Sequence, residues 1–207
     1  MSMSNRLANH FALAAVATAA VAATSNAAVV YSGILNFAIN ADLSGAYINV
    51  ETNVLSNGPG SGVPGWDVNP YGSSTAAISF YLTTGTGYMR NPGAGTSTGR
   101  TNIAEGTAIG ATAFYYTSST ATLGTAVGQW TANSTGIFGF KFLTADLTTH
   151  YGWMRLAIGA NTATRSVVDY GWESTANTSI LAGAGAPAPG ALALLGLAGL
   201  ATRRRRA

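Results

Sequence analysis

The sequence contains no cysteine, only two histidines and little charge, since Asp, Glu, Lys and Arg make up 8% of its 207 residues. Without cysteine the protein has neither disulfides nor thiolate ligands, so a hydrophobic core alone must hold the fold. His150 is the only histidine after residue 10, which excludes a histidine-rich metal site. It lies in an apolar stretch typical of a strand, which favours a structural role over a Ser-His-Asp triad. We predict no metal, no cofactor and no enzymatic activity.

Basic charge is scarce outside the two ends of the chain. The formal net charge is +3, but Arg6 and the four arginines at 203–206 supply half of the ten basic residues. The rest of the chain has five basic side chains against seven acidic ones, a formal charge of −2. A nucleic-acid interface needs a clustered basic patch, and none is visible there. The sequence thus predicts no nucleic-acid partner.

The first 27 residues have the pattern of a secretory signal peptide. Arg6 supplies a positive charge, residues 7–24 are mostly Ala, Val and Leu, and small residues follow at 25–27. We expect signal peptidase to cleave after Ala27, with Ala28 as the alternative position; a retained N-terminal helix is the other interpretation. This pattern predicts an exported protein.

The last 21 residues combine prolines, an apolar run and a basic end. Pro187 and Pro189 precede 13 uncharged residues at 190–202. A helix of that length spans about 20 Å, which is short against a bilayer hydrocarbon core of roughly 30 Å. The positive-inside rule keeps an adjacent basic cluster on the cytoplasmic side. That cluster consists of Arg203, Arg204, Arg205 and Arg206.

This tail resembles the PEP-CTERM sorting signal of exported bacterial proteins, in which Pro-Glu-Pro, an apolar helix and a basic cluster end the chain. Here the motif reads Pro187-Ala188-Pro189, so Ala188 replaces the glutamate. The resemblance implies that the membrane protease exosortase cuts near the prolines after transient anchoring in the inner membrane. It also implies a final location at the cell surface or in the extracellular matrix. A plain C-terminal membrane anchor is the alternative.

Residues 28–181 have the pattern of an all-β domain. Stretches of period two predict strands, and Gly-rich stretches at 57–64 and 83–110 predict loops. Many short strands of this kind predict an antiparallel β-sandwich, jelly-roll-like, flanked by the N-terminal signal helix and a short C-terminal hydrophobic helix. We expect a linker with the Pro-Ala-Pro motif at 182–189 and the sorting signal at 190–207. The strands are expected at 29–39, 45–51, 76–82, 136–143, 149–159 and 165–173.

Alternation within these strands predicts which side chains face the core. Arg155 is expected at the boundary with solvent, where it pairs with Asp169 of the next strand. The side chains expected to face inward are Phe138, Phe140, Phe142, Met154 and Leu156.

Tryptophan occurs close to an acidic residue in "GWDVNPYG" and "VVDYGWES". In sugar-binding clefts an aromatic ring stacks on the sugar while a carboxylate bonds its hydroxyls, and glycosidases need two carboxylates in one cleft. The same residues also fill β-sandwich cores, so sugar binding, catalysis and simple packing all remain open. Two short acidic stretches, at 40–42 and 67–69, supply too few oxygen ligands for a calcium loop. The candidate ligand-binding residues are Trp66, Asp67, Tyr71, Trp153, Asp169 and Trp172.

Four segments, "GAYINV", "PGWDVNPYG", "FGFKF" and "HYGWMRL", resemble those of secreted bacterial proteins that often end in this sorting tail. The resemblance implies an extracellular β-rich domain. We therefore expect an exosortase-processed cell-surface or exopolysaccharide-matrix protein, structural or weakly carbohydrate-adhesive. Its expected partners are signal peptidase and exosortase during export, and exopolysaccharide afterwards. The alternative is a secreted carbohydrate-active enzyme with a β-sandwich fold.

Overall fold

The computed structural model describes residues 28–187, which form an all-β domain of antiparallel strands. Two short 3-10 turns, η1 (Gly60–Gly62) and η2 (Pro92–Ala94), interrupt the strands. Within the described range no helix is long and apolar enough to cross a membrane. The expected signal helix and the sorting signal from Ala188 onward lie outside the described residues. The prediction of an all-β domain is confirmed.

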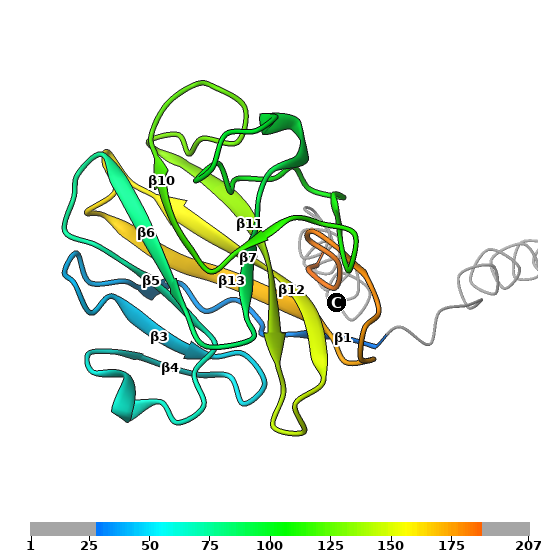
Figure 1. Cartoon of the computed structure of the whole chain (residues 1–207). Coiled ribbons are helices and arrows are strands. Elements are labelled where there is room, and N and C mark those ends of the chain that lie inside the picture. Colours follow the sequence, from blue (N-terminus) through cyan, green and yellow to red (C-terminus); the bar gives the residue numbers. More distant parts are fainter. Residues whose placement is uncertain (1–27, 188–207) are drawn as a thin grey trace, which may run out of the picture.

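Most strands belong to two large sheets (Figure 1). The first sheet contains, in spatial order, β1 (Val29–Tyr31), β13 (Arg165–Glu173), β12 (Thr149–Ile158), β11 (Ser134–Leu143), β7 (Gly87–Met89) and β9 (Tyr115–Tyr116), and β2 (Phe37–Ala38) also pairs with β13. The second sheet contains β10 (Ser118–Thr122), β6 (Ala77–Leu82), β5 (Val68–Tyr71), β3 (Ala46–Asn49) and β4 (Val54–Asn57). A small third sheet pairs β14 (Ile180–Leu181) with β8 (Ala108–Ile109).

The three longest predicted strands are present in the first sheet. β11 and β12 form an antiparallel hairpin whose register runs from Ser134 opposite Ile158 to Leu143 opposite Thr149. β13 then pairs with β12, and a bulge lies between Arg155 and Leu156. These strands were predictable because each carries a long apolar alternation.

The main core lies between the two large sheets. The ring centroid of Phe80 in the second sheet is 4.9 Å from that of Phe138 in the first. Tyr88 of β7 packs 4.7 Å from Phe80 by the same measure. The side chains predicted to face inward are all buried in this core: Phe138, Phe140, Phe142, Met154 and Leu156. The predicted strand orientations of β11 and β12 are therefore confirmed.

A second apolar cluster covers the outer face of the first sheet. Trp153 of β12 has no exposed surface and donates from Nε1 to the carbonyl oxygen of Ala184 at 3.1 Å. Ile109 of β8 and Ile180 of β14 belong to the same cluster. In Figure 1 the orange C-terminal segment lies beside β12 and β1. This face of the first sheet is consequently closed to solvent at Trp153.

The folded domain extends past the expected boundary at residue 181, which corrects the predicted linker. Ala182 is 2% exposed, and its N–H donates to the carbonyl oxygen of Thr107 at 2.9 Å. Ala184 and Ala186 pack against the second cluster. Small alanine side chains allow this segment to lie close to the sheet, so a composition that suggests a flexible spacer here forms part of the fold.

Several strands were not predicted, and β5 shows why. It carries Pro70 although it lies between β6 and β3, and proline usually occurs at sheet edges because it lacks an N–H. β5 pairs with β3 at one position, Ile48 opposite Val68. Beyond this pair Gly45 has a φ of +62° and approaches Tyr71 so closely that a Cβ there would collide with it. The pairing of β5 with β3 thus ends before Pro70, which lies opposite Phe80 of β6.

Candidate functional site

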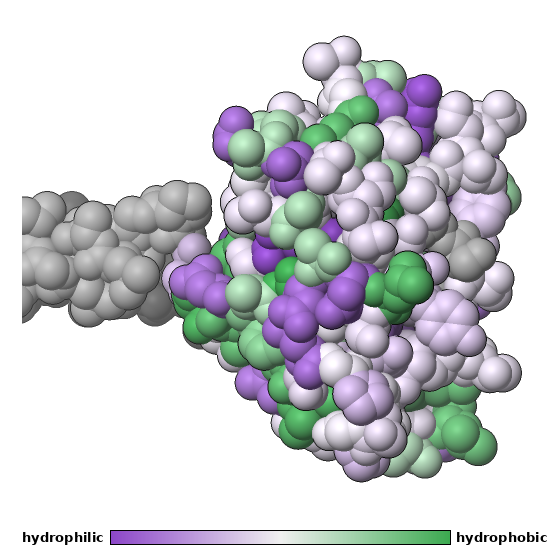
Figure 2. All heavy atoms as spheres, turned by 90° about the vertical axis from the view of Figure 1, so that its left-hand side faces the viewer, coloured by the Kyte–Doolittle hydropathy of each residue, from purple (hydrophilic) through white to green (hydrophobic). Residues whose placement is uncertain are grey.

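The outer face of the second sheet carries polar and aromatic side chains in rows. Asn69 of β5 lies opposite Tyr81 of β6. On the other side of β5, Ile48 of β3 pairs with Val68, and the next position along this register brings Tyr47 beside Asn69. The next row along the strands, about 6.5 Å away, contains Asn49, Asp67 and Thr83. The face seen in Figure 2 is mostly pale, the colour of intermediate hydropathy, with hydrophilic and hydrophobic residues in separate patches.

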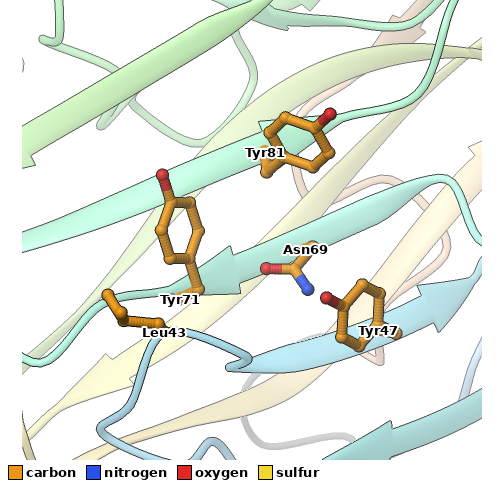
Figure 3. A pocket seen from close by; sticks show the side chains of 5 residues that line it. All are labelled: Leu43, Tyr47, Asn69, Tyr71 and Tyr81. Carbon is orange, nitrogen blue, oxygen red and sulfur yellow. The ribbon is translucent and has the colours of Figure 1, made fainter. Parts of the chain in front are cut away.

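A pocket of about 190 Å³ lies on the first of these rows. Figure 3 shows the Asn69 side chain in the middle, with the rings of Tyr47, Tyr71 and Tyr81 around it and Leu43 beside Tyr71. We call these five residues the tyrosine groove. Neighbouring strands supply its walls: β3, β5 and β6. Tyr81 is 54% exposed, so one wall of the groove is open to solvent.

The hydroxyl groups of the tyrosine groove have no hydrogen-bond partner among the described residues. Within residues 28–187 none of the three tyrosine hydroxyls makes a hydrogen bond, whereas Asn69 donates from Nδ2 to the carbonyl oxygen of Ser44 at 2.8 Å. That bond fixes the orientation of the Asn69 amide. The groove therefore presents three rings and three free hydroxyls around one oriented amide, which suits a ligand with both apolar faces and hydroxyls.

Trp66 stands at one end of the tyrosine groove. Its ring centroid lies 5.0 Å from that of Tyr47 and 5.8 Å from that of Tyr81. Gly60 in η1 permits this arrangement, because a Cβ there would lie 2.8 Å from both Trp66 Nε1 and the Tyr47 ring. A glycine at position 60 thus lets the turn approach and orient both rings.

A second pocket of about 290 Å³ lies on the other side of Trp66. Its lining includes the carboxylates of Glu51 and Asp67, and we call it the acidic cleft. The tip of the β11–β12 hairpin closes one side, where the Ala145 N–H donates to Glu51 Oε2 at 3.1 Å. The cleft is also lined by Asn49, Thr83 and Thr84.

Asp67 is the most perturbed group of the acidic cleft. It is 5% exposed, and its Oδ2 accepts a hydrogen bond from the Val50 N–H at 2.9 Å. Burial is the main reason why the pKa of the Asp67 carboxyl is raised to about 7; the Val50 hydrogen bond opposes this rise, and the charge of Glu51 adds to it. Within the described residues Oδ1 has no hydrogen-bond partner. Asp67 is therefore a carboxyl that changes charge near neutral pH.

Three of the six predicted ligand-binding residues lie on this face: Trp66 lines the acidic cleft with Asp67, and Tyr71 lines the tyrosine groove. Trp153 and Asp169 lie on the other sheet, beneath the second cluster. Asp169 has no exposed surface, and its Oδ2 accepts hydrogen bonds from Tyr31 at 2.9 Å and from Arg155 at 3.0 Å. The predicted pairing of Arg155 with Asp169 is confirmed, and neither Trp153 nor Asp169 is open to a ligand.

Trp172 lies in the main core, 7% exposed, with its ring at 5.4 Å and nearly perpendicular to those of Phe142 and His150. His150 Nδ1 is 2.7 Å from the Glu173 carbonyl oxygen, and Nε2 is 2.9 Å from Thr148 Oγ1. Both nitrogens of His150 thus have structural partners. The candidate residues Trp153, Asp169 and Trp172 are therefore buried in the structure and line neither pocket.

One nucleophile-like spacing is present in a loop. Residues 95–99 read Gly-Thr-Ser-Thr-Gly, the spacing of a hydrolase nucleophile elbow. They follow η2 in a turn region rather than joining a strand to a helix. Because His150 is engaged in the core, Ser97 has no histidine base available within the described residues.

Sequence reasoning missed Tyr47, Asn69 and Tyr81. The signal was present, because Tyr47 alternates with the buried Ala46 and Ile48, and Tyr81 follows the buried Phe80. The predicted binding residues were based on tryptophan close to an acidic residue, a pattern that includes neither Tyr47 nor Tyr81. Reading the polar half of each alternation would have placed Tyr47 and Tyr81 on one exposed face.

Among residues 28–187 no three His, Asp or Glu side chains gather as metal ligands. Asp42, one of the acidic residues considered for calcium, accepts hydrogen bonds from the Ser44 and Gly45 N–H groups and so organises a turn. These bonds lower the pKa of the Asp42 carboxyl, and the bond from Gly45 lowers it most.

Comparison with protein-family models, with curated proteins and with solved structures found no match to this chain.

Proposed function

We propose that this chain is an exported cell-surface or exopolysaccharide-matrix protein that binds carbohydrate through the tyrosine groove. The observation that carries the binding proposal is the set of three tyrosine rings with unpartnered hydroxyls around Asn69. Aromatic rings stack on the apolar faces of sugars, and hydroxyl and amide groups bond the sugar hydroxyls. Exposed Tyr81 and half-buried Tyr47 and Tyr71 provide both in one pocket.

We further propose that the two large sheets form a β-sandwich of the jelly-roll-like kind that the sequence predicts. Support comes from the shared core, in which Phe80 of the second sheet meets Phe138 of the first. The chain also crosses between the two sheets from β2 to β3, from β6 to β7, from β9 to β10 and from β10 to β11. At each of these crossings the strand before and the strand after belong to different sheets.

Binding can be tested by a glycan screen on the full chain, purified in a detergent without a sugar headgroup. We expect at least one neutral saccharide to bind, and Tyr81→Ala to weaken that binding about tenfold, or about 1.4 kcal/mol. Phe114→Ala is the matched control, because Phe114 is an exposed aromatic residue, 69% accessible, outside the groove. Equal loss in both variants, or no saccharide bound, would contradict the proposal.

Export and processing rest on the two terminal signals, which lie outside the described residues. We expect the mature protein to lack residues 1–27 and everything from about Pro189 onward. Replacing Arg203–Arg206 with serine should release the uncut precursor while leaving the domain folded, because each arginine costs about 2.5–3.5 kcal/mol at a helix centre. Intact-mass spectrometry of surface-extracted protein from the native host tests this. A mature protein that retains its arginines would support a plain membrane anchor instead.

A second candidate is a secreted carbohydrate-active enzyme, favoured by the two carboxylates that line the acidic cleft. With a pKa of about 7, Asp67 is protonated in about half of the molecules at neutral pH. In this candidate function the protonated form donates its proton to a glycosidic oxygen, while Glu51 activates water. Release of reducing sugar from a bound oligosaccharide, lost in both Asp67→Asn and Glu51→Gln, would establish this activity. Binding without release supports the adhesive function.

A further inference from the structure

The tyrosine groove and the acidic cleft adjoin each other along the strands. Trp66 lines the cleft, and its ring packs against Tyr47 and Tyr81 of the groove. The row containing Asn69 and the row containing Asp67 are consecutive on the outer face of the second sheet, about 6.5 Å apart. A chain-like ligand lying along the strands would therefore pass from one pocket to the other beside the Trp66 ring.

Together the two pockets have the size of an ordinary ligand site. Their volumes are about 190 Å³ and about 290 Å³. Pockets that hold small organic ligands usually measure about 300–1,000 Å³. Each pocket alone falls below that range, and the two combined fall within it.

The charges around both pockets select the class of ligand. No lysine or arginine is among the described residues that line either pocket. The cleft carries Glu51 and Asp67; Asp67 is 5% exposed, and its Oδ1 accepts no hydrogen bond from the residues that the structure describes. An anionic ligand would meet uncompensated repulsion here, whereas a neutral sugar offers hydroxyl donors to the carboxylates.

We propose that the tyrosine groove and the acidic cleft are two subsites of one site for an uncharged oligosaccharide, with Trp66 as the stacking platform between them. This inference rests on the proposed carbohydrate-binding function and names its ligand class: a neutral chain of more than two sugar units. Uronic-acid and sulfated chains are excluded by the acidic subsite.

Chain length tests the two-subsite arrangement. The probes are cello-, xylo- and manno-oligosaccharides of two to six units, titrated calorimetrically into the full chain in a detergent without a sugar headgroup. We expect the dissociation constant to fall at least tenfold between two and four units. Thr84→Arg should remove this gain, because the long side chain fills the cleft from an exposed position, and should leave disaccharide binding unchanged. Thr125→Arg, at an exposed position that lines neither pocket, is the matched control.

Charge tests the ligand class. We expect tetragalacturonate to bind at least tenfold more weakly than the best neutral tetrasaccharide. Glu51→Gln should narrow that difference, since it removes a charge from an exposed residue with little risk to folding. Asp67→Asn should reduce the difference in affinity between the charged and the neutral tetrasaccharide further. This variant keeps a side-chain oxygen that can accept the hydrogen bond from the Val50 N–H.

Three results would overturn the inference. Affinity that does not rise with chain length, or a rise that survives Thr84→Arg, would show that the acidic cleft is no subsite. Equal binding of tetragalacturonate would contradict the neutral class. In each case disaccharide binding that depends on Tyr81 would leave the proposed function standing, whereas absence of binding at every length would refute both. If mass spectrometry shows that the probe becomes shorter during the titration, the acidic cleft is a hydrolytic subsite and not a second binding subsite.

Discussion

The outer faces of the two large sheets contain the same residue types, but one face is covered and the other is open. On the first sheet, Trp153 is buried under the segment that includes Ala184. On the second sheet, Trp66 and the exposed Tyr81 border pockets. Tryptophan near a carboxylate is therefore not itself a sign of a binding site. What separates the two faces is whether another part of the chain lies on top.

The tyrosine hydroxyls show the same difference. On the covered face Tyr31 donates to Asp169 at 2.9 Å, and Tyr115 donates to the Gly110 carbonyl oxygen at 3.0 Å. In the tyrosine groove the hydroxyls of Tyr47, Tyr71 and Tyr81 have no partner within residues 28–187. Paired hydroxyls stabilise the fold, whereas unpaired ones at the surface are available to a ligand.

Two of the buried carboxylates, Asp169 and Asp67, differ in their surroundings as well. Burial raises the pKa of Asp169, but the Tyr31 hydrogen bond and the positive charge of Arg155 act against that rise. Among the described residues no cation lowers the pKa of Asp67, and the charge of Glu51 adds to the effect of burial. The covered carboxylate thus belongs to a bonded network, and the open-face one titrates near neutral pH.

Removing the tryptophan of the covered face should have the largest effect. Trp153→Ala should lower the free energy of unfolding by about 3–5 kcal/mol, the usual cost of truncating a buried aromatic residue. Urea denaturation monitored by circular dichroism measures it. A loss below about 1 kcal/mol would mean that the covering segment does not pack on Trp153 in solution.

The pH dependence of the free energy of unfolding tests whether Asp67 differs from Asp169 as described. Folded Asp67 keeps its proton up to about pH 7, whereas the unfolded chain releases it near 3.8. Between these values the folded state binds more protons, so stability is greatest below pH 3.8 and falls as pH rises through 7. The change should be about 2–4 kcal/mol, since each pKa unit corresponds to about 1.4 kcal/mol.

Asp67→Asn should remove this part of the pH dependence. Unfolding free energies of the original protein and the variant, measured at pH 5 and pH 8, give the difference that belongs to Asp67. Glu51→Gln is the control for a nearby exposed carboxylate. Identical pH profiles for the original protein and Asp67→Asn would show that Asp67 ionises normally.

The tyrosine hydroxyls offer a matched pair of smaller changes. Tyr31→Phe should cost about 1–2 kcal/mol, because buried Asp169 loses one of its two hydrogen-bond donors. Tyr47→Phe should change stability by less than about 0.5 kcal/mol, since its hydroxyl bonds to none of residues 28–187. If both substitutions cost the same, the contrast between paired and free hydroxyls would be refuted.

The smallest expected change in stability comes from the open face. Tyr81→Ala should leave the free energy of unfolding within about 0.5 kcal/mol, because the side chain is 54% exposed. Thermal unfolding measured beside the binding assay separates loss of fold from loss of binding. A large drop in stability would mean that the Tyr81 ring supports the sheet rather than a ligand.

Part of this site was predictable, and part was not. Trp66, Asp67 and Tyr71 follow from their local sequence. Tyr47 and Tyr81 join them only through strand pairing, since Asn69 lies opposite Tyr81 and beside Tyr47. β5 escaped prediction because Pro70 argues against a central strand, and without β5 the two neighbouring strands cannot be placed side by side.

Sequence alone was enough to predict the all-β class, the strands β11, β12 and β13, and the inward direction of Phe138, Phe140 and Phe142. These are local properties, because a two-residue period assigns each side chain to a face wherever the strand lies. Only the tertiary structure decided that Trp153 is covered while Trp66 borders a pocket. Covering depends on segments distant in the sequence, such as Ala182–Ala186 over Trp153, and local alternation carries no information about which face such a segment will occupy.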